Sequence, residues 1–444
     1  MATQETLKVT DHLSDLSAEQ GRLATLDEYR NMTEVERGIG ASLGISYKLL
    51  NEEQQRFWRG LSVFPGGFDA GAAGNVGQSE NFKAADKTLG ALHAASMVQW
   101  DEATGRFRLH DLARDYGRDR LSEAERGDVE ERHAAHYLIV LARADELFLE
   151  GGDSILLGLA LFDLEWGNIV AGQAWAAAQR ETGEIAAKLC NAYPTAGVYC
   201  IDLRLHSRER IAWLDAALEA ARTLNDRKAE GNHLGNLGLA YADLGEPRKA
   251  IEYHEQDLVI SKEIGDRRGE GQDLGNLGLA YADLGEPRKA IEYHEQALAI
   301  SKEIGDWRGE GQDLGNLGLA YADLGEPRKA IEFYEQILVI FQEIGDRRGE
   351  GNALGNMGLA YAYLGEPRKA IEFYEQHIVI AKEIGDRLGE GNTSHNIAGE
   401  LFTIGRVDEA IAYAERAVEI YEQIESPNLA DARAQLEKLR KQRD

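Results

Sequence analysis

The chain has 444 residues and a formal net charge of −28, from 77 acidic and 49 basic residues. This length exceeds one compact domain, and the acidic surplus repels nucleic-acid phosphates and favours a basic protein partner. No stretch approaches the ~18 consecutive apolar residues of a membrane helix, no signal peptide opens the chain, and Cys190 and Cys200 are too few for a disulfide framework or a four-cysteine metal cluster. We therefore expect a cytoplasmic protein with no membrane segment.

The first part of the chain alternates short helical patterns with one hairpin pattern. Residues 1–32 are polar around a helical stretch at 13–26. Further helices are predicted at 35–50, 52–61, 81–95 and 110–121, with Asn51 as a cap, and strands at 97–100 and 106–109. Helices followed by a β-hairpin predict a small winged-helix domain over residues 33–123.

This domain also resembles a known module. The stretches ISYKLLNEEQQRFWRGLSVFPGGFD and LGALHAASMVQWDEATGRFRLHDLARDYGRDRL are similar to the winged helix of bacterial NB-ARC/STAND signalling ATPases. In that family an MHD-like motif follows the wing, and its histidine contacts the β-phosphate of ADP bound to a neighbouring nucleotide domain. The resemblance implies that His110 and Asp111 are nucleotide-sensing residues, and that residues 1–32 end a missing NB-ARC region.

The chain departs from that family in lacking the nucleotide-binding motifs. It contains no GxxxxGK[ST] P-loop, no Gly-Lys pair and no Walker B strand. We therefore expect no enzyme activity, no catalytic residues and no cofactor, with ADP or ATP bound only if a separate nucleotide-binding domain joins as a partner. The alternative is that His110 only starts a helix and Asp111 is a carboxylate in its first turn.

A winged helix can also bind DNA, which is a rival hypothesis. A reading helix brings basic side chains to bases and phosphates. The helix at 81–95 has Lys83 and Lys87, but Asp86 lies between them and Glu80 precedes it. This charge balance argues against nucleic acid as a partner.

Residues 124–183 are predicted to be a helical linker, with amphipathic helices at 129–149 and 163–179. Within the linker, His133 and His136 are spaced i, i+3, a spacing that could hold a metal. Because the sequence offers no convincing third ligand, we interpret them as surface histidines and expect no metal. Beyond the linker, helices are predicted at 185–193, ended by Pro194, and at 207–222.

A 40-residue unit then occurs five times, at 226–265, 266–305, 306–345, 346–385 and, less regularly, 386–425. A fixed period of this size predicts stacked supersecondary units. In the second copy, Asp266 is expected to cap helix A at 267–283, and Pro287 to start helix B at 287–303. Gly285 and Gly305 suit positions of positive φ after each helix.

The repeat resembles the tetratricopeptide repeat (TPR) in the spacing of Leu277-Gly278, Tyr281, Gly285, Ala290 and Ala297. Its GDRxGEG…LGNLGxAYxxLGE wording is similar to that of kinesin light chains and G-protein-signalling modulators, whose repeats hold peptide segments of partner proteins. The resemblance implies an all-α, right-handed superhelical solenoid. Residues 184–225 would be a degenerate TPR-like pair, and a helix in 426–444 would cap the array.

In the TPR arrangement, helix A lines the concave surface, so the resemblance places two ladders of side chains in a peptide- or protein-binding groove. The predicted groove residues are Asn236, Asn276, Asn316, Asn356, Asn396, Asp243, Asp283, Asp323 and Tyr363. An asparagine offers both a donor and an acceptor to an extended peptide backbone. The alternative is that each asparagine bonds to the neighbouring helix and only fixes the register of the stack.

Three functions follow from these patterns. The first is a protein-interaction and sensor module of a STAND-type signalling protein, which binds a protein or peptide in the groove and relays it through the winged helix. The second is a free-standing TPR adaptor or scaffold with a vestigial winged helix. The third is a DNA-binding transcription regulator.

Overall fold

The computed structural model describes residues 34–443. The predicted helical stretch at 13–26, and with it the interpretation of residues 1–32, lies outside these residues. The chain divides into two compact units, Met1–Ala229 and Glu230–Asp444. The predicted bounds at 33, 124 and 184 fall inside the first unit and stay predictions.

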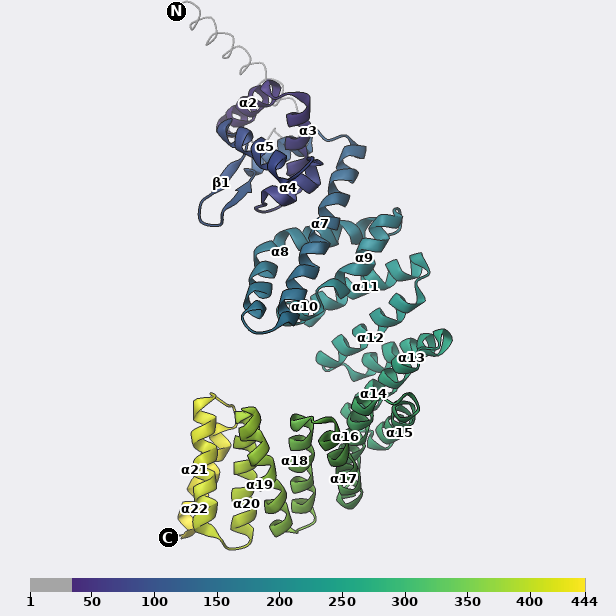
Figure 1. Cartoon of the computed structure of the whole chain (residues 1–444), viewed down its shortest axis with the longest axis vertical. Coiled ribbons are helices and arrows are strands. Elements are labelled where there is room, and N and C mark those ends of the chain that lie inside the picture. The colour runs from purple at the N-terminus through teal and green to yellow at the C-terminus, as the bar shows by residue number, and fades with distance from the viewer. Residues whose placement is uncertain (1–33, 444) are drawn as a thin grey trace, which may run out of the picture. The chain divides into compact units, whose positions relative to one another are not determined.

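The first unit consists of short helices and a hairpin, followed by longer helices (Figure 1). Its elements are α2 (Glu34–Leu49), α3 (Glu52–Gly60), η2 (Leu61–Val63), α4 (Ala70–Gly77), α5 (Phe82–Ala94), β1 (Gln99–Asp101), β2 (Arg106–Arg108), α6 (Asp111–Arg118), α7 (Glu123–Glu150), α8 (Ser154–Gln179), α9 (Glu184–Ala196), α10 (Val198–Arg204) and α11 (Ser207–Leu224). The strands are antiparallel, with Trp100 opposite Phe107. The predicted hairpin is therefore present.

Capping side chains set where two of these helices begin. The Asn51 side chain accepts a hydrogen bond from the Gln54 amide at 2.8 Å, and the Gln54 side chain accepts one from the Asn51 amide at 3.1 Å. Ser122 and Glu125 form the same reciprocal pair at the start of α7. Such a capping box satisfies two amide groups that the first turn leaves without partners, so Asn51 is a cap as predicted.

One hydrophobic core runs through the first unit, from Tyr47 to Ala220. Trp58 is fully buried, and its indole N–H donates to the Met97 carbonyl at 2.9 Å. The rings of Phe64 and Phe68 stack with their centroids 4.4 Å apart. The short helices, the hairpin and the long helices α7 to α9 therefore share one core.

A buried ion pair joins the hairpin to α8. The Arg106 guanidinium donates to both carboxylate oxygens of Glu165, at 2.6 and 2.8 Å, and to the Gly67 carbonyl at 2.9 Å. The Asn168 amide also donates to Glu165, at 3.0 Å. Both charged residues are more than 90% buried, so removing either one would leave the other charge uncompensated.

The region after α8 differs from the prediction in two ways. Helix α9 does not end at Tyr193 but continues through Pro194 to Ala196. Pro194 removes the hydrogen bond to the Cys190 carbonyl and crowds that carbonyl, and its buried packing offsets this cost. The short helix α10, which the sequence reasoning missed, lies between α9 and α11 and buries Cys200 and Ile201.

Helix α8 corrects the statement that no stretch is apolar enough for a membrane segment. Its most apolar 18-residue window has a mean hydropathy of 1.4, which by length and composition alone would suit a membrane span. That is weak evidence, because core helices of soluble proteins show the same composition. One face of this helix, including Phe162 and Ile169, is buried in the core of the first unit, while Leu156, Leu157 and Leu164 are exposed.

The second unit is a stack of helix pairs in chain order (Figure 1). Its helices are α12 (Arg227–Asp243), α13 (Pro247–Ile264), α14 (Arg267–Asp283), α15 (Pro287–Ile304), α16 (Trp307–Asp323), α17 (Pro327–Ile344), α18 (Arg347–Tyr363), α19 (Pro367–Ile384), α20 (Arg387–Thr403), α21 (Val407–Gln423) and α22 (Leu429–Arg443). The even-numbered helices α12 to α20 are the predicted A helices, and the odd-numbered α13 to α21 are the B helices. The prediction of paired helices at a 40-residue period is confirmed.

The turn residues of the repeat act as predicted. The Asp266 carboxylate accepts a hydrogen bond from the Gly269 amide at 2.9 Å and caps α14. Gly285 and Gly305 have φ of 72° and 70°, a region that favours glycine, and Pro287 is the first residue of α15. The sequence therefore fixes both ends of each helix locally.

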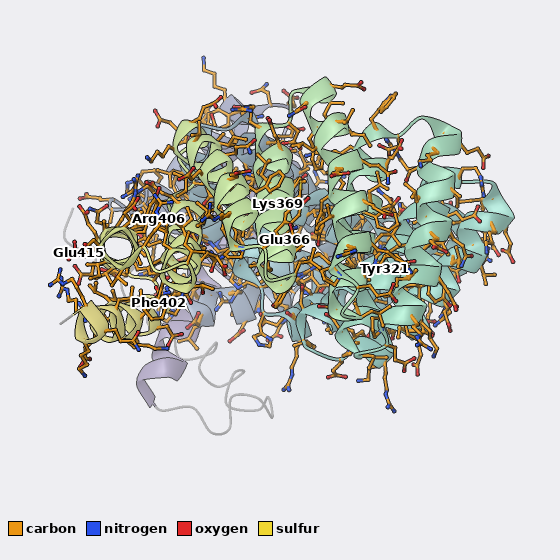
Figure 2. The ribbon with its side chains drawn as sticks, turned by 90° about the horizontal axis from the view of Figure 1, so that it is seen from below. Tyr321, Glu366, Lys369, Phe402, Arg406 and Glu415 are labelled. Atoms are coloured by element: carbon orange, nitrogen blue, oxygen red, sulfur yellow. The ribbon has the colours of Figure 1, made fainter. Side chains whose placement is uncertain are left out.

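Stacked rings and a lysine hold the two helices of a repeat together. The rings of Tyr281 and Tyr293 are nearly parallel, with centroids 5.2 Å apart, and the Lys289 ammonium lies 4.7 Å from the Tyr281 centroid. In the fourth copy the corresponding Lys369 pairs with Glu366 at 2.7 Å, and Figure 2 shows these two residues near each other. This cation–π contact recurs in the first four copies, so it is a structural feature of the repeat.

The A and B helices approach closely at one glycine in each of the first four copies. A Cβ atom on Gly278 would lie 2.5 Å from the buried His294 ring, and one on Gly318 would lie 2.3 Å from the Tyr334 ring. No larger residue fits at these positions without moving a buried ring. These glycines are therefore required by packing, although glycine weakens a helix by about 1 kcal/mol relative to alanine.

The interfaces between successive copies are not identical. Between the second and third copies, the Ser301 hydroxyl donates to the buried Asp313 carboxylate at 2.8 Å. One copy later, Phe341 and Ala353 occupy these positions in an apolar cluster. The next interface is polar again, because the His377 ring is within hydrogen-bond distance of the Thr393 hydroxyl, at 2.6 Å. At its end, Ala432, Leu436 and Leu439 of α22 cover the last pair, as predicted for a capping helix.

Candidate functional site

A cavity of about 790 Å³ lies in the second unit, on the face formed by the A helices α14, α16 and α18. Residues of α15 and α17 form its sides, including Ile300, Ile304, Ile337 and Phe341. We call this cavity the groove, and it extends across the second, third and fourth copies of the repeat. Its lining combines carboxamides, aliphatic side chains and bare helix backbone.

Glycines line the groove in place of side chains. Gly271, Gly275, Gly311 and Gly315 all belong to its lining. A Cβ on Gly275 would meet only Asp313, at 3.7 Å, and one on Gly315 only Ile337, also at 3.7 Å. Packing would therefore accept alanine at Gly275 and Gly315. Keeping glycine there weakens each helix and opens the groove.

Three predicted asparagines, Asn276, Asn316 and Asn356, lie together in this lining. All three are half-buried, and within residues 34–443 none of their side chains forms a hydrogen bond with the protein. Their carboxamides are therefore not used to fix the stack in the way that the alternative interpretation required. Each has a donor and an acceptor available to a ligand.

Two further ladders flank the asparagines, and the sequence reasoning missed both. Carboxamides of Gln272, Gln312 and Asn352 line the groove one turn before each asparagine. Exposed leucines line it one turn after three of the asparagines in the A helices; these are Leu239, Leu279 and Leu319. The periodicity could have revealed them, because positions i−4 and i+3 share a helix face with position i.

The charges of the groove are largely paired within the protein. Arg268 donates to the Asp306 carboxylate at 3.0 Å across two copies. A hydrogen bond from the Gly309 amide, followed by that arginine, lowers the pKa of Asp306. Burial raises the pKa of Asp313 to about 6. With Arg308 also in the lining, the groove is not locally acidic, although the whole chain is.

The other predicted groove residues lie elsewhere. Asn236 and Asn396 are half-buried but do not belong to this lining. Asp243, Asp283, Asp323 and Tyr363 are exposed at the ends of their A helices and likewise lie outside it. The structure thus brings together three of the nine predicted residues in one cavity, while a binding role for the other six stays a prediction.

A pair of acidic residues is buried beside the groove, between the first and second copies. Asp257 and Asp273 are both more than 90% buried, and Ser261 donates to Asp273 at 2.9 Å. The Asp257 carboxylate lies so close to Gly231 and Gly235 that a Cβ there would approach it within 2.7 and 2.5 Å. Burial, and then the neighbouring Asp273, raises the pKa of Asp257 well above its usual range.

The predicted nucleotide-sensing residues have local partners in the first unit. His110 caps α6, where its ring nitrogen accepts a hydrogen bond from the Leu112 amide at 3.3 Å. The exposed Asp111 carboxylate pairs with Arg114 one turn later. These contacts agree with the helix-start interpretation, and nucleotide sensing by His110 and Asp111 stays a prediction.

The histidine pair of α7 is not at the surface, contrary to expectation. His133 is 1% exposed, and burial lowers its pKa to about 3. The His136 ring is within hydrogen-bond distance of the Asn75 amide, at 2.9 Å. No group of three or more metal-ligating side chains is found between residues 34 and 443. Both histidines therefore belong to the packing of α7.

Comparisons with known proteins identify the repeats. Models of the tetratricopeptide repeat match residues 234–268, 270–343, 314–383 and 350–423. These residues are tetratricopeptide repeats, which confirms the predicted resemblance. The array is accordingly a TPR solenoid, the fold of a protein-interaction module, and the groove lies on the A helices of its second to fourth repeats.

Two curated relatives are named as HTH-type transcriptional regulators, one from Mycobacterium tuberculosis and one from Mycobacterium bovis. Each is 30% identical over 198 residues, which are 44% of this chain and 21% of the relative. The chain thus spans about a fifth of the length of these relatives. A solved structure of a STAND protein with a tetratricopeptide repeat sensor, from Pyrococcus horikoshii, aligns with a TM-score of 0.51 and 17% identity over 96% of this chain and 68% of that chain. This last likeness is one of fold.

Proposed function

We propose that the groove binds an extended peptide segment of a partner protein. The observation that carries this proposal is the ladder of Asn276, Asn316 and Asn356, whose carboxamides repeat along the groove without protein partners. Peptide N–H and C=O groups alternate along an extended strand, so such a ladder can pair with main chain of any sequence. The neighbouring glycines give that main chain room to approach.

The lining also suggests which peptides fit. Leu279, Leu319 and Ile300 offer apolar contacts, so aliphatic side chains of the ligand would lie beside its paired backbone. The paired arginine and aspartates leave little net charge in the groove. Any preference for the charge of the peptide therefore comes from the charge of the whole chain. The net charge of −28 favours a basic partner and speeds its association.

A cysteine-protection experiment tests where the peptide binds. Cys190 and Cys200 are buried, and burial raises the pKa of each to about 11, so neither should react with a thiol reagent at neutral pH. Peptides are first selected from a displayed random library on the full chain. Gln312→Cys then places a reactive thiol in the groove, and Gln296→Cys places one on an exposed face of α15 outside it.

A selected peptide should slow the alkylation of Gln312→Cys at least tenfold and leave Gln296→Cys unchanged. Equal alkylation rates with and without saturating peptide at Gln312→Cys would refute the groove as the binding site. Both variants change an exposed or groove-lining carboxamide, so the core is undisturbed.

The wider role that we infer is that of the sensor part of a STAND-type signalling protein in the cytoplasm. Support comes from the resemblance of residues 33–123 to the winged helix of that family and from the Leu109-His110-Asp111 motif. In this role peptide binding would be relayed through the winged helix to a nucleotide-binding domain supplied by another segment. A free-standing adaptor would bind the same peptides without that relay.

A candidate from another class is a part in transcription regulation, which the names of the mycobacterial relatives favour. If the chain itself binds DNA, α5 is the helix that would insert into the DNA duplex, with Lys83 and Lys87 as its basic residues. Duplex binding at physiological salt that Lys83→Ala and Lys87→Ala weaken would support this candidate. Binding only at low salt would exclude α5 as a reading helix.

A further inference from the structure

A second cavity, of about 520 Å³, lies in the first unit between η2, α6, α7 and α8. The buried residues Val129 and His133 of α7 form its floor. Trp175 of α8 and Leu121 contribute apolar sides, and the exposed Arg118 lies at its rim. The lining thus combines apolar side chains with charged and polar ones. His110 and Asp111 do not belong to its lining.

Three arginines face this cavity, although the chain as a whole is strongly acidic. Arg114, Arg118 and Arg126 belong to the lining, against a single carboxylate, Glu130. Burial lowers the pKa of His133 to about 3, so this residue adds no charge at neutral pH. The lining therefore has a net charge of about +2, while the chain carries −28. A local excess of arginines of this kind favours an anion.

Contacts within the protein do not occupy all the hydrogen-bond donors of these arginines. Arg126 donates through one terminal nitrogen to the Arg118 carbonyl at 3.2 Å, but its Nε is buried without a partner. The Arg118 guanidinium forms no ion pair with any described residue. Arg114 is held by the Pro65 carbonyl at 2.8 Å and by Asp111, which fixes its position at the cavity. The Nε atoms of Arg59 and Arg180, which lie outside this cavity, are also buried without a partner, so what distinguishes the cavity is its excess of arginines.

We propose that this cavity binds a small organic anion, a molecule with a phosphate or carboxylate group and an apolar body. The anionic group would lie at Arg118 and Arg126 and would accept hydrogen bonds from their guanidinium groups. The apolar body would lie against Trp175 and Val129. This site is in the first unit, so it is independent of the proposed peptide groove in the second.

Titration of the full chain with defined probes tests this site. The probes are phenyl phosphate and benzoate, with benzyl alcohol as the uncharged analogue and inorganic phosphate as the anion without an apolar body. The test variant is Arg118→Ala, which removes an exposed guanidinium and leaves the core intact. Arg208→Ala removes an exposed arginine on α11, outside the cavity, as the matched control.

We expect saturable binding of phenyl phosphate or benzoate with one site per chain, and the stronger of the two identifies the preferred anionic group. Arg118→Ala should weaken that binding at least tenfold and Arg118→Glu more, while Arg208→Ala should have no effect. Benzyl alcohol should not bind at the same concentration, and inorganic phosphate should bind at least tenfold more weakly. Absence of saturable binding at millimolar concentration, or an equal loss in Arg118→Ala and Arg208→Ala, would overturn the proposal.

Discussion

The two kinds of glycine on α14 predict opposite effects of the same substitution. Gly275→Ala and Gly278→Ala each add one methyl group, three residues apart on one helix. At Gly275 the new Cβ would meet only the Asp313 carboxylate, at an ordinary contact distance of 3.7 Å. At Gly278 it would lie 2.5 to 2.7 Å from three atoms of the buried His294 ring.

The magnitudes follow from these contacts. Replacing glycine by alanine in a helix stabilises it by roughly 0.5–1 kcal/mol. Gly275→Ala should gain that amount, because nothing opposes the methyl group. Gly278→Ala gains the same but displaces a packed ring, which costs typically about 1–3 kcal/mol or more. The net effect at Gly278 is a loss of up to about 2.5 kcal/mol, and because the helix gain is common to both variants, they should differ by the displacement cost of about 1–3 kcal/mol.

Urea denaturation of the full chain, followed by circular dichroism, measures this difference. Because repeat arrays can unfold in parts, the comparison uses the complete curves of the two variants rather than a single extrapolated free energy. The midpoint should rise for Gly275→Ala and fall for Gly278→Ala. Midpoints that shift in the same direction by the same amount would refute the assignment of these glycines to different roles.

The same pair of variants connects stability with binding. The methyl group of Gly275→Ala enters the groove, so this variant should bind selected peptides more weakly while being more stable. That outcome would explain why glycine is present at a position where packing accepts alanine.

Three other substitutions test further parts of the structure. Asp257→Ala should stabilise the array by about 1–3 kcal/mol at pH 8, because it removes a buried carboxyl group. Because the pKa of Asp257 is raised in the folded state, the stability that this carboxyl group contributes is fully present below its ordinary pKa and is lost as pH rises through the raised pKa. The advantage of the variant in thermal melts should therefore grow with pH; an advantage independent of pH would contradict this. Arg106→Met should cost about 3–5 kcal/mol by leaving Glu165 unpaired, and adding Glu165→Leu should restore most of it; equal loss in both variants would argue against the ion pair. Gly285→Ala should cost about 1–2 kcal/mol through its positive φ, and Gly285→Asn less, as measured by urea denaturation; two equal losses would count against a backbone cause.

The repeat was the most predictable part of the fold, for local reasons. Helices predicted at 267–283 and 287–303 are observed at Arg267–Asp283 and Pro287–Ile304. The residues that fix these ends, Asp266, Gly285 and Pro287, act within their own turns, so a single copy contains the necessary information. The hairpin of β1 and β2 and its flanking helices were predictable because their turn and capping residues also act locally.

Contacts between distant residues were not predictable from the sequence. The burial of His133 depends on Phe64, whose ring lies 5.2 Å away and which is distant in sequence. Likewise, Asp257 stands where later copies have apolar residues or histidine, and only the stacked copies show that it meets Asp273. Periodic patterns report which face a residue occupies but not which side chain lies opposite.

The groove, too, was predictable only in part. The TPR resemblance placed the asparagines on the concave face, and three of them line the cavity. Which of the five would do so depends on where the B helices leave space, and that is decided by residues such as Phe341 and Ile337. The last residues of the A helices, including Asp283 and Tyr363, lie outside the cavity lining.

The affinity of a selected peptide for two triple variants tests the central claim most directly. The first variant combines Asn276→Ala, Asn316→Ala and Asn356→Ala in the groove. The control combines Gln256→Ala, Gln296→Ala and Gln336→Ala, which removes three exposed carboxamides at the same 40-residue spacing on the B helices. Peptide hydrogen bonds are worth about 0.5–1.5 kcal/mol each, so the groove variant should bind at least tenfold more weakly while the control binds as the parent does. Equal affinity of parent, groove variant and control would contradict the account.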